Sequence, residues 1–300
     1  MIGNHSETFQ KEGIVMANVR IFADSTCDLS PALVEKYGLT IVPLYIVMDD
    51  QSYKDGVEAT PEKIFTWAEA NKTTPKTAAP SPDLVTQALK PAMEAGDEAI
   101  FFTISAQMST TYNVVRLAAE DLGYDRLHIV DSKNLSTGIG LQVLKAAEMA
   151  QAGKSAQEIV TWIEGHRDLV RASFVVDTLT YLARGGRCNA VTAFVGNALK
   201  LHPKIVVKDG AMGVSKKYVG GIQYVLGKYV RDMEKELKNA DPSRVFITHS
   251  GCSEDTLTAM WEYLRSLNHF DEILETTAGG VISSHCGPKT LGVLFYAKEN

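Results

Sequence analysis

The chain of 300 residues is long enough for one large or two medium-sized domains with a substantial hydrophobic core. Hydrophobic residues make up 45 % and charged residues 22 %, as is usual for soluble globular proteins. The formal net charge of −6 argues against a general nucleic-acid-binding surface, and no apolar run approaches the ~20 residues of a membrane span.

The N-terminal segment and the cysteines favour a cytoplasmic protein. Residues 1–17 lack the apolar core of a signal peptide, and we expect them to form a disordered tail. The four cysteines have no C-x-x-C pair or other metal-type spacing, so no zinc site or other metal is expected. In the cytoplasm they would be reduced thiols. They are Cys27, Cys188, Cys252 and Cys286.

Strands and helices alternate over 18–168, which indicates an N-terminal α/β domain with a mainly parallel sheet flanked by helices. The expected strands are Val19–Ala23, Thr40–Val47, Ala99–Ile104 and Leu127–Val130. The expected helices are Pro31–Tyr37, Pro61–Ala70, Asp83–Ala95, Tyr112–Leu122, Leu141–Ala152 and Gln157–Val170. The polar segment 49–60 and the proline-interrupted segment 73–82 are expected to be loops.

A second α/β domain is expected over 169–300, after a junction near Gly165–Ala172. The expected strands are Ala172–Val176, Lys204–Val207, Met212–Val214, Arg244–Ser250 and Glu272–Thr276. The expected helices are 190–201, Gly220–Asn239 and Thr256–Leu267. Asp209-Gly210 predicts a tight hairpin turn. A glycine-flanked run, Val281–Pro288, is expected to end the fold.

Polar residues follow three of the expected strands, at Asp24–Thr26, Ser105–Thr111 and Asp131-Ser132. Ligands of open α/β sheets bind at the C-terminal ends of the strands. The stretch Ser105–Thr111 also opens a helix, whose free N–H groups and dipole favour an anion. Taken alone, Ser109 or Thr110 could simply cap that helix.

Six motifs together resemble the DegV family of bacterial fatty-acid-binding proteins, in the family's order and over roughly 18–297. The family patterns are D-S-T-x-D-L, T-S-Q-P-S-P, S-S-G-L-S-G-T-Y, D-S-K, L-x-x-G-G-R and a terminal H-T-G-P-G. The matching segments here are Asp24–Leu29, Thr77–Pro82, Ile104–Tyr112, Asp131–Lys133, Leu182–Arg187 and Ile282–Pro288.

The resemblance implies a two-domain DegV-like fold with a lipid site between the domains and no cofactor or catalytic residue. It implies that Thr77 and Ser109 hold the carboxylate of one long-chain fatty acid, with His285, Arg187 and Ser105 in the supporting network. Hydroxyl donors suit such an acceptor-only anion. A histidine there titrates near neutrality and could couple binding to protonation.

In the family the bound acid is presented to a fatty acid kinase for acyl-phosphate formation and phospholipid synthesis. The expected docking arginine of the kinase-serving members is Lys216 here, which keeps the charge but loses bidentate pairing. Other departures surround the head-group site: Thr110 stands where the family has glycine, so this turn cannot need a strongly positive φ. Cys286 and Lys289 replace threonine and glycine of the last motif.

The acyl chain needs an apolar slot, for which the sequence offers many residues that could equally be ordinary core. The candidates are Phe101, Phe102, Ile104, Met108, Phe174, Phe194, Val195, Leu199 and Ile282.

Two other classes of function stay open from the residues alone: an enzyme, either a hydrolase or a phosphotransferase, and a binding protein for another anion. A hydrolase could use Ser109, His285 and Asp24 or Asp131 as a triad, although no G-x-S-x-G elbow is present. A phosphotransferase would need a phosphate-binding loop, and no G-x-x-x-x-G-K-[ST] run occurs. A binding protein for another small anion, such as a sugar phosphate, would fit the hydroxyl-rich strand ends without any apolar slot.

Overall fold

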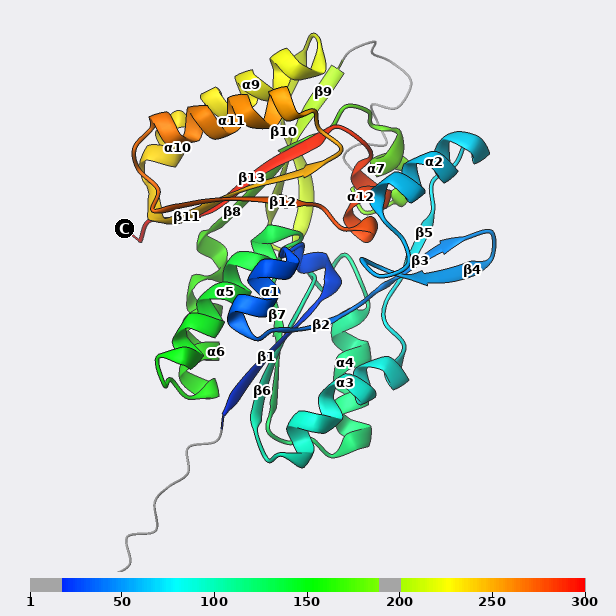
Figure 1. The fold of residues 1–300 in the computed structure, drawn as a ribbon, viewed down its shortest axis with the longest axis vertical. Helices are drawn as coiled ribbons and strands as arrows, with labels where there is room; N and C mark the ends of the chain where they lie inside the picture. The colour runs from blue at the N-terminus through cyan, green and yellow to red at the C-terminus, as the bar shows by residue number, and fades with distance from the viewer. Residues whose placement is uncertain (1–17, 189–200, 300) are drawn as a thin grey trace, which may run out of the picture.

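The computed structural model describes residues 18–188 and 201–299, whose strands form three sheets (Figure 1). We call them the parallel sheet (order β2-β1-β6-β7), the mixed sheet (order β10-β9-β8-β13-β11-β12) and the small sheet (order β4-β3-β5). The expected tail 1–17 and the expected helix 190–201 lie outside the described residues, apart from Leu201, which begins β9.

The parallel sheet confirms the expected α/β architecture of the first half, because all its neighbouring strands run in parallel. Its strands are β1 (Val19–Asp24), β2 (Thr40–Val42), β6 (Glu98–Thr103) and β7 (Leu127–Asp131). Both faces are covered, so Ala99–Phe102 in the middle of β6 is an unbroken apolar run: Phe101 packs towards one face and Phe102 towards the other.

Helices cover the two faces of the parallel sheet (Figure 1). One face carries α3 (Pro82–Glu94) and α4 (Thr111–Leu122). The other carries α1 (Pro31–Tyr37), α5 (Thr137–Gln151) and α6 (Ala156–His166).

The small sheet corrects three expectations for the first half. The single strand expected over Thr40–Val47 is two strands, because Pro43 has no N–H with which to continue the ladder of β2. The chain resumes as β3 (Tyr45–Met48) in the small sheet. The expected loops contribute its other two strands, β4 (Gln51–Lys54) and β5 (Lys76–Ala78), on either side of β3. The helix α2 (Pro61–Asn71) lies between them in the chain.

The mixed sheet is antiparallel except between β11 and β12. In chain order its strands are β8 (Val170–Val175), β9 (Leu201–Lys208), β10 (Ala211–Val219), β11 (Ala240–Ser250), β12 (Glu272–Thr277) and β13 (Thr290–Ala297). The helices among the described residues of this half are α7 (Thr180–Gly185), α9 (Ile222–Asp232), α10 (Glu234–Lys238), α11 (Glu254–Ser266) and α12 (Gly280–Cys286).

Three further expectations are wrong. The run Val281–Pro288 does not end the fold, because β13 follows it and occupies the middle of the mixed sheet. The helix expected to reach Val170 ends at His166, since Val170 instead pairs with Tyr296 of β13. The helix expected over Gly220–Asn239 breaks at Met233, whose N–H bonds to the carbonyl of Val230 three residues back.

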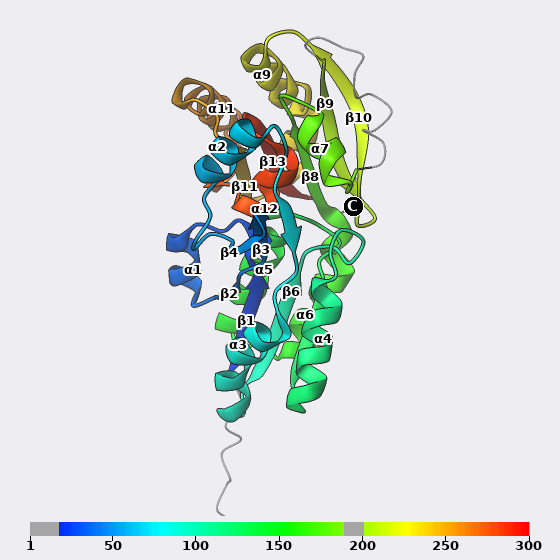
Figure 2. The ribbon, with the colours of Figure 1, turned by 90° about the vertical axis from the view of Figure 1, so that its right-hand side faces the viewer.

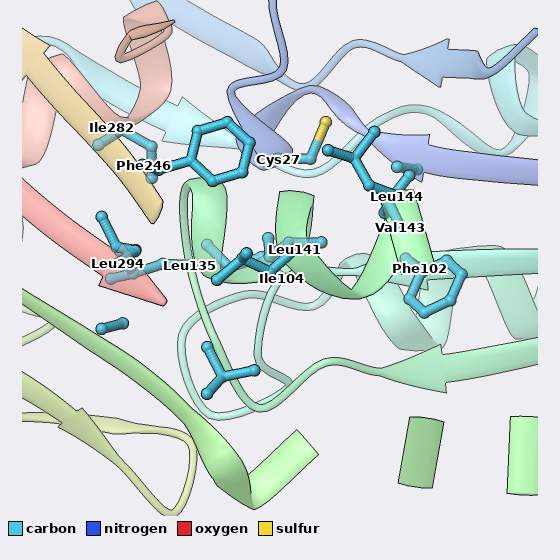
Figure 3. Packing of buried hydrophobic residues seen from close by; sticks show 14 of the residues in the cluster. Cys27, Phe102, Ile104, Leu135, Leu141, Val143, Leu144, Phe246, Ile282 and Leu294 are labelled. Carbon is cyan, nitrogen blue, oxygen red and sulfur yellow. The ribbon is translucent and has the colours of Figure 1, made fainter. Parts of the chain in front are cut away.

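Helix α5 lies between the parallel and mixed sheets, and its buried side chains join them into one hydrophobic core. Figure 3 shows Leu141 of α5 beside Ile104 and Leu135, with Ile282 and Leu294 from the second half of the chain close by. The division into domains at 168–169 stays a prediction, because this core runs across it.

Candidate fatty-acid site

A cavity of about 510 Å³ lies where the loop after β6, strand β5, helix α12 and strand β10 meet. Its polar lining residues are Thr77, Gln107, Ser109, Thr110, Asn113, Arg187 and His285. Its other lining residues are Leu44, Ala78, Ala79, Ile104, Ala106, Met108, Leu135, Met212, Val281, Ile282 and Cys286. The cavity therefore combines a group of hydroxyl and imidazole side chains with a largely aliphatic wall.

Thr77 and His285 contact each other in the wall of this cavity. Thr77 lies in β5, and its Oγ1 is 2.8 Å from Nε2 of His285 near the end of α12. If Nε2 carries the hydrogen, the imidazole donates to Oγ1 and leaves the threonine hydrogen free for an acceptor in the cavity. Nδ1 of His285 is buried with no partner among the described residues.

His285 does not titrate near neutrality, contrary to the expectation from an ordinary imidazole. Burial lowers its pKa to about 4, and the nearby Arg187 guanidinium acts in the same direction. The ring is therefore neutral at pH 7. A neutral imidazole orients the Thr77 hydroxyl without adding a charge to the cavity.

Ser109 lies in the turn that leads into α4. Its Oγ accepts from the N–H of Thr111 and is 2.8 Å from the Thr111 hydroxyl. Ser109 thus satisfies the first N–H of α4 from the position before the N-cap. The N-cap residue Thr110 makes no capping bond with its side chain and has a φ of −84°, in line with the expectation that this turn needs no glycine. When the Thr111 hydroxyl donates to Ser109, the serine hydrogen is free for a ligand.

Two aspartates hold the loop that carries Ser109, and the sequence suggested instead that they face a ligand. The buried Asp24 at the end of β1 accepts from the N–H of Ile104 at 2.7 Å. Asp131 at the end of β7 accepts from the N–H of Ala106 at 3.1 Å. Burial raises the pKa of Asp24 to about 6, although hydrogen bonds from Thr26 and Ile104 oppose the shift.

Two further buried carboxylates hold the beginning of α12. Asp28 accepts from the N–H of Gly279 at 2.8 Å, and Asp55 accepts from the N–H of Gly280 at 2.7 Å. Burial raises the pKa of both groups. The fit is close, since a Cβ on Gly280 would lie 2.5 Å from Ile46 Cδ1. Asp55 comes from a stretch that carried no motif signal.

The turn between β9 and β10 closes on the loop after β6 (Figure 2). Ser105 Oγ donates to the carbonyl of Gly210, and Gln107 Nε2 donates to the carbonyl of Asp209, each at 2.6 Å. We call this the hairpin contact. Ser105, expected in the carboxylate network, is therefore engaged by the hairpin and does not line the cavity.

Arg187, also expected in the carboxylate network, lines the cavity, and its guanidinium donates to the carbonyls of Gly185 and Met108.

Of the proposed acyl-chain candidates, Ile104, Met108 and Ile282 line the cavity. Phe101 and Phe102 are fully buried in the core, and the candidates Phe194, Val195 and Leu199 lie outside the described residues. Phe174 lines a small cavity of about 20 Å³ beside the main one. The two cavities share Leu135, Ile282 and Cys286, so the small void extends the apolar wall inward.

The side chains expected for a hydrolase triad do not assemble. Ser109 and His285 have different hydroxyl partners, Thr111 and Thr77, and the carboxylates of Asp24 and Asp131 bind backbone N–H groups. Within 18–188 and 201–299, no cluster of histidine, cysteine and acidic side chains could hold a metal ion. No helix in these ranges is long and apolar enough to cross a membrane.

Comparison with known proteins identifies the family. The family model described as "Uncharacterised protein, DegV family" matches residues 18–298. A DegV domain-containing protein of Deinococcus radiodurans is 33 % identical over 92 % of this chain and 97 % of its own length. Another, from Clostridium perfringens, is 31 % identical over 95 % of this chain and all of its own. The chain therefore belongs to the DegV family.

Solved structures show the same fold. A DegV family protein of Thermus thermophilus, described for its fatty acid binding, has a TM-score of 0.84 and 30 % identity. The alignment covers 94 % of this chain and all of that one. A stearic acid-binding protein of Eubacterium ventriosum has a TM-score of 0.81 and 26 % identity, with 93 % of this chain and 98 % of that chain covered.

Proposed function

We propose that this protein binds one long-chain fatty acid, with the carboxylate at Thr77 and Ser109 and the acyl chain along the aliphatic wall of the 510 Å³ cavity. The observation that carries the proposal is the Thr77–His285 hydrogen bond in the wall of a cavity whose remaining lining is mostly apolar. The fatty-acid-binding structures of the same fold give independent support.

The chemistry of the head-group site suits a carboxylate. The ligand oxygens accept hydrogen bonds, and the Thr77 and Ser109 hydroxyls supply them without a second charge to desolvate. The N-terminal end of α4 adds a favourable dipole. The Ser109 and His285 side chains do not meet, so the arrangement favours binding over hydrolysis.

Presentation of the acid to a fatty acid kinase in the cytoplasm, for phospholipid synthesis, belongs to the same proposal. The position expected to dock the kinase, Lys216, is exposed and forms an ion pair with Asp232 at 2.6 Å. A docking partner would have to compete with that ion pair. A pull-down with the purified kinase, comparing the wild type with Lys216→Ala, tests this step separately from lipid binding.

Mass spectrometry of the protein from a bacterial host, without added lipid, tests the binding function. We expect a native mass that exceeds the sequence mass by one C14–C18 acid, and the same acid in the organic extract of the denatured protein. An empty protein that also fails to take up added oleate or palmitate would contradict the proposal. A smaller polar anion in the native spectrum would support the alternative of a binding protein for another acid.

A further inference from the structure

A second cavity, of about 420 Å³, opens where strands β8 and β9 separate. The two strands pair only from Ser173 to Val175 of β8, opposite Val206 to Lys204 of β9. Arg171 and Ala172 on one strand, and Val207 and Lys208 on the other, extend beyond the paired part and line the cavity. The floor is apolar, with the buried Ala172 and Phe295.

Cationic side chains predominate around this cavity, although the whole chain carries a net charge of −6. The cations are Lys133, Arg167, Arg171, Lys204 and Lys208, and the acids are Asp168, Asp209 and Glu236. Among the described residues, only Arg167 of these eight takes part in an ion pair, a 3.7 Å contact with Glu164 outside the cavity. The cavity therefore has a surplus of positive charge that its own acids do not neutralise.

Two of the cations, Arg167 and Lys204, are held in the wall of the cavity. Arg167 donates from Nη1 to the carbonyl of Asp131, but its buried Nε has no acceptor among the described residues. Lys204 is half-buried over the ring of Tyr229, with Nζ 5.6 Å from the ring centroid. Burial lowers the pKa of Lys204. The buried Arg167 Nε is a donor without an acceptor among the described residues, which costs free energy that a bound oxyanion would recover.

We propose that this cavity binds a small molecule through a phosphate group, held between the diverging strands by its five cations, Lys133, Arg167, Arg171, Lys204 and Lys208. A phosphate dianion matches the surplus of five cations over three acids, and its oxygens accept from both ammonium and guanidinium donors. The partly exposed Val207 would contact an organic substituent. The site is distinct from the cavity of Thr77 and Ser109 and does not depend on fatty acid binding.

Isothermal titration at low ionic strength with inorganic phosphate, pyrophosphate and phenyl phosphate tests the proposal. We expect saturable binding of at least one, weakened roughly tenfold in Lys204→Met and in Lys208→Gln, since each removes a hydrogen bond to a charged group. Lys204→Met keeps an aliphatic stem over Tyr229, and Lys208 is exposed, so neither change should unfold the chain. Tighter binding of phenyl phosphate than of phosphate would indicate a phosphate ester as the natural ligand, and the reverse would indicate a free phosphate.

Two controls make the result specific. Lys90→Met removes the same charge from the exposed face of α3 and should leave binding unchanged. Ser109→Ala should also leave it unchanged, because that residue lines the other cavity. The proposal is overturned if no anion binds the wild type, if Lys90→Met weakens binding as much as Lys204→Met does, or if Ser109→Ala abolishes it.

Discussion

Thr77 Oγ1 and His285 Nε2 lie 2.8 Å apart although 208 positions separate the two residues in the chain. The threonine comes from the small sheet and the histidine from the last turn of α12, so the bond joins the first and last parts of the sequence. The proposed head-group site thus exists only when both halves are folded together.

If both hydroxyls hold one carboxylate, Thr77→Val and Ser109→Ala should each weaken binding of palmitate by about 2 kcal/mol. The double variant should lose less than the sum, because either change releases the same group. Calorimetric titration of the wild type, the two single variants and the double variant with palmitate gives the coupling energy between the two hydroxyls. Thr73→Val, at an exposed position just before β5, is the matched control. Strict additivity would place the two residues in separate interactions.

Gly185→Ala should disturb His285. A Cβ at Gly185 would lie 2.2 Å from His285 Nδ1, so the ring must move and the bond to Thr77 should break. We expect a loss of roughly 1–3 kcal/mol in unfolding free energy, together with weaker binding of palmitate. Gly165→Ala is the control, since no atom lies within 4 Å of a Cβ there and alanine favours the helix. Unchanged binding in Gly185→Ala would separate the histidine from the site.

His285 should make the protein less stable as the pH falls. Its pKa is about 4 in the folded state against 6.5 for an ordinary histidine, so the unfolded chain binds more protons between these values. Relative to His285→Gln, the wild type should lose about 3 kcal/mol of unfolding free energy between pH 6.5 and pH 4. Urea unfolding of both proteins across this range measures the difference.

Asp24 has the opposite effect, because its pKa is raised to about 6 and the folded state holds its proton longer. Its contribution to stability is lost as the pH rises from about 4 to 6. Both proteins contain Asp24, so this contribution cancels in the comparison. If the unfolding free energies of the wild type and His285→Gln changed in parallel with pH, the histidine would not be desolvated in the folded protein.

Asp55→Ala should loosen the beginning of α12. The variant loses the acceptor for the N–H of Gly280 and for the Ser25 hydroxyl, which should cost about 1–3 kcal/mol in unfolding free energy. Asp55→Asn keeps one carbonyl acceptor and should lose less. Thermal unfolding at constant pH compares both with Asp125→Ala, an exposed control. Equal losses in the alanine and asparagine variants would argue against a hydrogen-bonding role.

Patterns local in sequence predicted much of this fold, and long-range pairing accounts for what they missed. The alternation of apolar runs indicated the parallel sheet, and Asp209-Gly210 indicated the hairpin. Strand β13 was missed although Leu291–Ala297 is a nearly unbroken apolar run, because periodicity alone does not distinguish a short apolar strand from a buried helix segment.

Part of the candidate site could likewise be predicted from local motifs, and the rest depends on contacts between distant parts of the chain. Motifs singled out Thr77, Ser109 and His285, which line one cavity. They also singled out Asp24, but the role of its carboxylate depends on Ile104, 80 positions away. Asp55 had no motif, and its contact with Gly280 becomes visible only in three dimensions.

The hairpin contact has a consequence for how this protein can change over generations. Ser105 and Gln107 reach only carbonyl oxygens of the turn, which every amino acid possesses. Substitutions at Asp209 that tolerate its left-handed backbone would therefore keep the hairpin contact. A comparison of sequences would not reveal this contact. Gly210 is the exception, because a Cβ there would lie 2.8 Å from Ser105 Oγ. The part of the turn most open to substitution is thus the residue whose carbonyl holds Gln107 of the loop after β6.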